Sequence, residues 1–132
     1  MHVLFVCVAN NGRSVMAEQL FRRAAGGRHQ ARSAGSEPGD AVHPQVAEAL
    51  NELGLDASAH VPRKLDQGAL SWADIAVSTC SEKVCPVTPG VRRISWVFDD
   101  PKSLPLERVR EIRDDIDRHV HELLAQFDQH NG

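Results

Sequence analysis

Short, strand-like runs of apolar residues alternate along the chain with segments whose apolar residues recur every three or four positions. The strand patterns cover residues 3–7, 30–34, 75–79 and 91–98. The helical patterns cover residues 15–25, a segment that starts at Pro44, a short segment at 64–72, and a long segment from Pro105 onward. This alternation predicts an α/β fold built on a parallel sheet.

Glycine and proline mark the expected ends of the helices. Gly26-Gly27 closes the first helix, and Gly54 is a natural stop for the helix that starts at Pro44. The apolar face of the last helix repeats at three- or four-residue steps through Val109, Ile112, Ile116, Val120, Leu123 and Phe127. We expect the last five residues, 128–132, to form a frayed tail.

Length and composition favour one enzyme domain, spanning residues 1–132. The net charge of −3 offers no basic stripe for a nucleic-acid backbone, so no nucleic-acid partner is expected. No apolar stretch approaches the ~20 residues of a membrane span, and no signal-peptide pattern opens the chain. The three cysteines, an odd number, predict free thiols in a reducing, cytoplasmic setting.

The segment Cys-Val-Ala-Asn-Asn-Gly-Arg-Ser at residues 7–14 joins the first strand to the first helix. A loop of this length can curl so that its backbone N–H groups point at one centre, beside the positive end of the helix dipole. The candidate oxyanion-binding residues are Val8, Ala9, Asn10, Asn11, Gly12, Arg13 and Ser14. Arg13 can hold two oxygens of a tetrahedral anion, and the same field favours a Cys7 thiolate that acts as a nucleophile.

The spacing of Cys7 and Arg13 is a weak signal alone, and a buried structural cysteine beside a surface arginine is the simpler alternative. The position between a strand and a helix strengthens the interpretation as an oxyanion site. Asn10 tolerates a positive φ and Gly12 has still more freedom, so a tight curl is feasible. Ser14 could cap the helix or donate its hydroxyl to the thiolate.

Residues 7–14 resemble the signature loop of the low-molecular-weight protein tyrosine phosphatase family, whose superfamily includes the thiol-coupled arsenate reductases. The resemblance continues through Ser33-Ala34-Gly35, Cys80 and Asp99-Asp100-Pro101. It implies a four-stranded parallel sheet flanked by helices, of the flavodoxin-like three-layer type, with strand order 2-1-3-4. Because ligands bind beyond the carboxyl ends of parallel strands, Cys7, Cys80 and Asp100 would face one crevice.

The resemblance further implies that Asp100, which precedes Pro101, is the general acid. Sulfur that attacks an oxyanion expels an oxygen, and this oxygen leaves more easily once it is protonated. Asp99 competes for the role, and a simple Asp-Asp-Pro turn is the plainer alternative.

Two features favour a reductase over a phosphatase. Phosphatases of the family generally carry tyrosines after their Asp-Pro, whereas here Lys102-Ser103 follows and the chain contains no tyrosine. The segment from Cys80 to Cys85 resembles the redox segment of arsenate reductases that pass a disulfide to thioredoxin. The implied reaction is attack of Cys7 on arsenate, release of arsenite by Cys80, and transfer of the disulfide to Cys85.

The chain departs from the sequence pattern of these arsenate reductases at several positions, so other reductants and other functions remain open. Four residues separate Cys80 from Cys85, a shorter spacing than in the resembled enzymes, and Ala9 stands where Gly or His is common. A low-molecular-weight thiol such as mycothiol, or a glutaredoxin-type system, could therefore replace thioredoxin, and the two later cysteines could be merely structural. A tyrosine phosphatase, or a redox-sensing or oxyanion-binding module without turnover, are the other candidate functions.

An external thiol reductant is expected in place of a bound cofactor. The family resemblance also suggests a monovalent-cation site, suited to K⁺, at Asn10, Glu18 and Ser33, with Asp66 as a fourth ligand. Glu18 as an ordinary solvated helix residue is the alternative. Such a site would tune the loop and would not carry the chemistry.

Overall fold

A four-stranded parallel sheet forms the centre of the molecule. The computed structural model describes residues 1–80 and 90–131. The strands are β1 (His2–Cys7), β2 (Gln30–Gly35), β3 (Ile75–Ser78) and β4 (Arg92–Ser95), and they lie in the order β2-β1-β3-β4. All neighbouring strands are parallel. The predicted fold class and strand order are confirmed.

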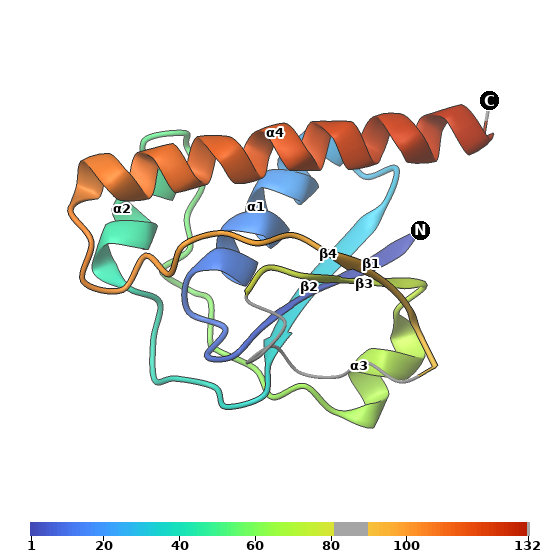
Figure 1. Cartoon of the computed structure of the whole chain (residues 1–132), viewed down its shortest axis with the longest axis horizontal. Coiled ribbons are helices and arrows are strands. Elements are labelled where there is room, and N and C mark those ends of the chain that lie inside the picture. The colour runs from blue at the N-terminus through green and yellow to red at the C-terminus, as the bar shows by residue number, and fades with distance from the viewer. Residues whose placement is uncertain (81–89, 132) are drawn as a thin grey trace.

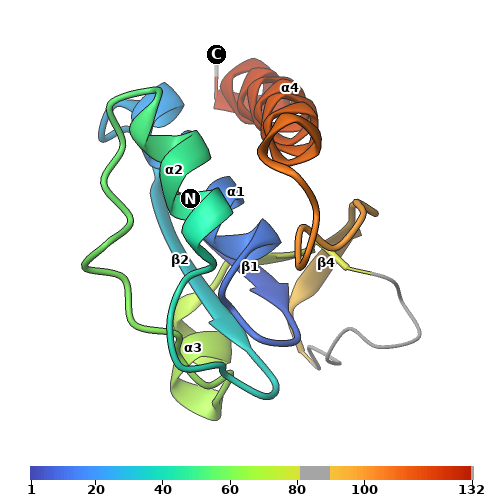
Figure 2. The same ribbon diagram turned by 90° about the vertical axis from the view of Figure 1, so that its left-hand side faces the viewer.

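Helices cover both faces of this sheet (Figures 1 and 2). One face carries α1 (Arg13–Ala25), α2 (Pro44–Asn51) and α4 (Leu106–Asn131), and α3 (Gln67–Trp72) packs on the other face. Val3 and Phe5 of β1 belong to the larger core cluster on the α1 side, whereas Leu4 and Val6 pack with residues of α3. Because both faces are covered, β1 reads as a continuous apolar run.

The long helix α4 is anchored along its length on its side of the sheet. Near the start of the helix, Arg113 donates to the carbonyl of Ala49 in α2 at 2.9 Å. Near its end, Asp128 accepts a hydrogen bond from Arg28 at 2.7 Å. The prediction of a frayed tail at 128–132 is therefore wrong for the described part, because α4 continues to Asn131. Among the described residues, no helix is long and apolar enough to cross a membrane.

The end of the fourth strand also differs from the prediction. The fourth strand was expected at 91–98 but ends at Ser95, and Trp96 makes one more backbone hydrogen bond to Ser78. Trp96 and Phe98 then turn onto α4, where both rings lie beside His119. Their apolar character thus reflects packing against the helix and not strand pairing.

The third helix starts later than predicted. It begins at Gln67 and not at residue 64, because the side chain of Asp66 caps it by accepting from the Ala69 N–H at 2.8 Å. The chain before the cap is extended enough for Lys64 to bridge Gly35 at the end of β2.

Gly35 fixes the distance between β2 and the loop that follows β1. It pairs with Cys7 in the sheet register. A Cβ atom at position 35 would lie 2.4 Å from the carbonyl oxygen of Val8 and 2.9 Å from the N–H nitrogen of Asn10. Both neighbours are backbone atoms, so neither can move without moving the loop. A glycine is required here for close approach, not for an unusual φ.

We predict that Gly35→Ala destabilises the protein and displaces the loop. The clash with backbone should lower the free energy of unfolding by about 2 kcal/mol, measured by urea denaturation, and weaken the binding of inorganic phosphate. Gly68→Ala in α3 is the matched control, because its nearest atom would lie at an ordinary 3.4 Å. Wild-type stability and phosphate affinity in Gly35→Ala would contradict the proposed close packing.

Candidate active site

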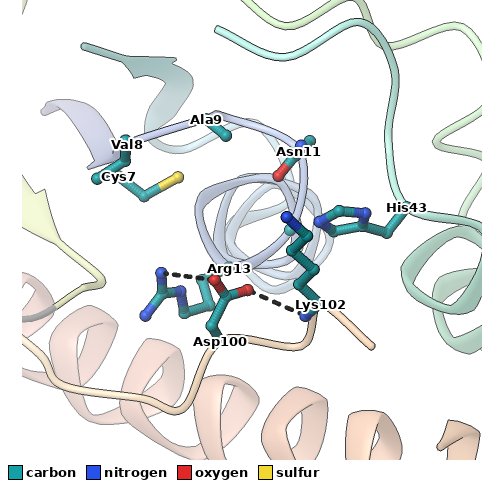
Figure 3. A pocket seen from close by; sticks show the side chains of 9 residues that line it. Cys7, Val8, Ala9, Asn11, Arg13, His43, Asp100 and Lys102 are labelled. Carbon is teal, nitrogen blue, oxygen red and sulfur yellow. Dashed lines mark hydrogen bonds and ion pairs between the residues drawn. The ribbon is translucent and has the colours of Figure 1, made fainter. Parts of the chain in front are cut away.

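A cavity of about 210 Å³ opens at the carboxyl end of β1 (Figure 3). Its lining residues come from the loop after β1, from the segment before α2 and from the segment after β4: Cys7, Val8, Ala9, Asn11, Gly12, Arg13, His43, Asp100 and Lys102. The position agrees with the rule that ligands bind beyond the carboxyl ends of parallel strands. Its size suits a small tetrahedral anion.

The loop is held in its curled shape from outside. Backbone N–H groups in the segment 36–43 donate hydrogen bonds of 2.8 to 3.3 Å to the carbonyls of Cys7, Val8, Ala9 and Asn11. A peptide unit whose carbonyl points outward directs the N–H of the next residue inward. The outward hydrogen bonds therefore create the inward ring of donors that an oxyanion needs.

Asn10 occupies the tightest point of the curl. Its φ of 51° confirms the expectation of a left-handed residue at this position. Its N–H donates to Cys7 Sγ at 3.2 Å. Gly12 departs from expectation: its φ is −147°, and glycine is needed because a Cβ would approach Pro101 Cγ to 2.9 Å.

A chain of hydrogen bonds runs from the backbone of residue 63 to the sulfur of Cys7. The N–H of Arg63 donates to Asn10 Oδ1 at 2.9 Å, which leaves the amide nitrogen of Asn10 to donate to Ser14 Oγ at 2.8 Å. Ser14 Oγ lies 3.0 Å from Cys7 Sγ. Because the oxygen of Ser14 already accepts from Asn10, its own hydrogen is available to the sulfur. In this arrangement the hydroxyl of Ser14 can donate to Cys7 Sγ.

Ser14 therefore follows the second of its two predicted alternatives. The N-cap residue of α1 is Gly12, and no side chain caps the helix there. The hydroxyl of Ser14 is buried beside the sulfur instead.

Cys80 lies beside Cys7, as the parallel sheet predicts. Cys7 is a free thiol and only 3% exposed, and Cys80 is fully buried. The two residues form a small buried cluster with Val8 packed against it. Cys85, the third predicted redox residue, lies outside the described residues.

Arg13 and Asp100 form one wall of the cavity (Figure 3). Arg13 Nη1 donates to the carbonyl of Phe98 at 2.9 Å, and Nη2 lies 3.9 Å from Asp100 Oδ2. The Phe98 contact orients the guanidinium on the wall that leads to Cys7. The neighbouring Asp99 turns away from this wall to pair with Arg108 and lines another surface cavity. The structure thus brings Asp100, not Asp99, to the predicted site.

The four residues suggested for a cation form two pairs in the described structure. The carboxylate of Asp66 is engaged at the start of α3, and Asp66 and Ser33 border a different cavity. Asn10 and Glu18 are instead joined by His60, whose Nε2 lies 3.1 Å from Asn10 Oδ1 and whose Nδ1 lies 3.8 Å from Glu18 Oε2. The cation site at Asn10, Glu18, Ser33 and Asp66 therefore stays a prediction.

The surroundings of His60 shift its pKa. Burial lowers the pKa of His60 below its ordinary value, and the nearby Glu18 carboxylate acts in the opposite direction. Glu18 is buried and is not the solvated helix residue of the alternative interpretation. The Oγ of Ser33 is buried without a hydrogen-bond partner among the described residues.

Sequence reasoning missed three residues of the site region: His43, His60 and Lys102. His43 and Lys102 line the cavity, and His60 contacts the loop from behind through Asn10. Lys102 had a signal, because it directly follows the Asp-Pro pair. The two histidines lie in irregular segments, and no periodicity marks their approach to the loop.

Comparison with known proteins identifies the family. The model of the low molecular weight phosphotyrosine protein phosphatase family matches residues 2–131. The chain belongs to this family.

Arsenate reductases are prominent among the relatives of this family member. This chain is 37% identical over 117 residues to arsenate reductase 2 of Staphylococcus epidermidis, and the match covers 86% of this chain and 88% of the relative. It is 38% identical over 130 residues to a putative arsenate reductase of Halobacterium salinarum, covering 93% and 90%.

Solved structures of the same family superpose closely. An arsenate reductase from Archaeoglobus fulgidus matches with a TM-score of 0.85 and 35% identity, over 93% of this chain and 98% of that one. The thioredoxin-dependent arsenate reductase Cg_ArsC1' of Corynebacterium glutamicum matches with a TM-score of 0.81 and 33% identity. That match covers 97% of this chain but 62% of the Corynebacterium chain.

Proposed function

We propose that the protein is an arsenate reductase that uses Cys7 as its nucleophile. The observation that carries the proposal is the contact between Cys7, at the base of the oxyanion-sized cavity, and the buried Cys80. Hydrolysis of a phosphate ester needs one cysteine, whereas reduction of arsenate needs a second thiol within reach of the first. The named activity of the curated relatives supports the same function.

In the first step the thiolate of Cys7 attacks the arsenic atom of bound arsenate. An As–S bond forms, and an As–O bond breaks. Asp100 gives its proton to the departing oxygen, which leaves as water. Inward N–H groups and Arg13 hold the remaining oxygens.

In the second step the thiolate of Cys80, in the reduced enzyme, attacks the sulfur of Cys7. An S–S bond forms, the As–S bond breaks, and its electron pair stays on arsenic, which leaves as arsenite. The two thiols are oxidised by two electrons and As(V) is reduced to As(III), so the step balances.

In the third step Cys85 attacks Cys80 and frees Cys7 for another cycle. The resulting Cys80–Cys85 disulfide is reduced by thioredoxin or a similar thiol system. The thioredoxin-dependent relative supports thioredoxin over mycothiol or a glutaredoxin-type reductant. This chemistry belongs in a reducing cytoplasm, where three thiols stay available between turnovers.

A tyrosine phosphatase is the second candidate, because the loop and Asp100 would serve a phosphate ester equally well. One feature of the cavity argues against it. No tyrosine, tryptophan or phenylalanine side chain lies among the described residues that line the cavity, so a phenyl ring would lack the large aromatic wall that such a substrate stacks on. We therefore expect phosphatase activity only as a weak side reaction.

The proposed function is tested by arsenite formation from arsenate with thioredoxin, thioredoxin reductase and NADPH. Wild-type protein should form arsenite, and Cys7→Ser should form none while it keeps its thermal unfolding temperature. Assay of p-nitrophenyl phosphate hydrolysis on the same preparations separates the phosphatase alternative. A protein that binds phosphate but carries out neither reaction would be an oxyanion-binding or redox-sensing module.

The assignment of the general acid predicts an asymmetry between two adjacent residues. Asp100→Asn should lower the rate of arsenate reduction about 100-fold, because the departing oxygen loses its proton donor. Asp99→Asn is the matched control and should change the rate less than twofold, since Asp99 pairs with Arg108 on the surface. Single-turnover rates measure both effects. If Asp99→Asn lowered the single-turnover rate and Asp100→Asn did not, Asp99 would be the general acid.

The relay predicts different end points for its two later cysteines. Cys85→Ser should release about one arsenite per protein and stop as a Cys7–Cys80 disulfide, because these two thiols supply two electrons. Cys80→Ser should stall with arsenic on Cys7. Mass spectrometry of the linked peptides and quantified arsenite distinguish these states. Sustained thioredoxin-driven turnover by Cys85→Ser would rule out the three-cysteine relay.

A further inference from the structure

Two side chains in the cavity have no part in the proposed reaction. Lys102 and His43 line the cavity together with Arg13, and Asp100 is the one carboxylate among the described lining residues. Figure 3 shows Lys102 extending from the turn after Asp100 toward His43 and the loop. The opening of the cavity is thus bordered by nitrogen-bearing side chains.

The backbone around Lys102 adopts an unfavourable conformation to hold this position. Residues 101–104 form a turn in which the N–H of Leu104 donates to the carbonyl of Pro101 at 3.1 Å. Ser103 within this turn has a φ of 63°, a conformation that side chains other than glycine rarely adopt. The N–H of Lys102 donates to Asp100 Oδ1 at 3.0 Å. The turn therefore couples the position of Lys102 to that of the proposed acid.

The geometry of attack determines which part of the bound ligand lies near Lys102. For sulfur to attack in line, the oxygen that departs must lie opposite Cys7, toward Asp100 and the opening of the cavity. In an inorganic oxyanion this outward oxygen is a hydroxyl or carries negative charge. In a phosphate monoester the same oxygen carries the organic group. The ammonium group of Lys102 at the opening stabilises the outward oxygen of an inorganic oxyanion. It is a hydrated group and provides no stacking surface for the aromatic group of a monoester.

We propose that Lys102 is a specificity-determining residue that favours inorganic tetrahedral oxyanions over phosphate monoesters of aromatic alcohols. The proposal rests on the proposed function only for the identification of arsenate as the physiological oxyanion. His43 borders the same opening and adds to its polarity. The charge and position of Lys102 take the place of the aromatic wall that a tyrosine phosphatase needs.

The test compares two ligands that differ at the outward position, inorganic phosphate and phenylphosphonate. Their affinities are measured by protection of Cys7 from alkylation with neutral iodoacetamide, each variant being compared with its own unliganded rate. The variants are Lys102→Met, the conservative Lys102→Arg, and Lys64→Met. Lys64 is an exposed lysine outside this cavity, so its loss is a matched change in net charge.

Lys102→Met should weaken phosphate binding about fivefold, the value of a partly solvated charge contact, and change phenylphosphonate binding less than twofold. Lys102→Arg should restore most of the phosphate affinity, and Lys64→Met should match the wild type. In the arsenate assay the KM of Lys102→Met should rise about fivefold while kcat stays within twofold.

Equal losses for both ligands in Lys102→Met would overturn the proposal, because a displaced loop would weaken both. Unchanged phosphate binding would also overturn it. If the wild type binds phosphate with the expected discrimination but forms no arsenite, the proposed reductase function fails and the specificity of the cavity for inorganic oxyanions stands.

Discussion

The site depends on the outward direction of the carbonyls in the loop after β1. Four of these carbonyls accept hydrogen bonds from the segment 36–43, and the N–H groups between them face the cavity as a result. A loop without these outer partners would leave its carbonyls free to turn inward, where they would repel an anion. The second layer of chain is therefore as necessary for oxyanion binding as the loop itself.

This constraint explains the small residues packed around the loop. A Cβ on Gly35 would collide with the backbone of Val8, and a Cβ on Gly39 would lie 2.8 Å from Asn11 Nδ2. A Cβ on Gly12 would collide with Pro101. The last contact ties the loop to the segment that carries Asp100. The close packing of Gly12 against the Pro101 ring thus fixes the nucleophile and the proposed acid relative to each other, without a direct bond between them.

The sequence could predict those parts of the site whose position follows from strand ends or short spacing. Cys7 ends β1 and Arg13 begins α1, so their approach needs only the strand–loop–helix order. Cys80 follows β3, which neighbours β1 in the predicted strand order. Asp100 was identified by the Asp-Pro pair, but its separation from Asp99 required the structure, because the two carboxylates differ only in how the turn directs them.

Other features could not be read from the pattern because they arise from tertiary packing. His60 reaches Asn10 through an irregular segment, and it joins Glu18, where a bound cation had been expected. The predicted end of β4 was wrong because Trp96 and Phe98 lie beyond the strand and pack against α4, although their apolar character resembles that of a strand. The end of α4 was misplaced because a polar tail remains helical when a partner such as Arg28 holds it.

One cavity can serve hydrolysis or reduction, and the difference lies in what attacks the intermediate on Cys7. Water must approach the bound arsenic or phosphorus atom from the opening, along the path bordered by Asp100 and Lys102. In the proposed relay the attacking thiolate is that of Cys80, which is buried beside Cys7. Because these two routes are separate in the proposed mechanism, we expect a change at the opening to alter the choice of anion and to leave the approach of Cys80 to Cys7 unchanged. The proposed mechanism thus places substrate selection at the opening and electron transfer at the buried contact between Cys7 and Cys80.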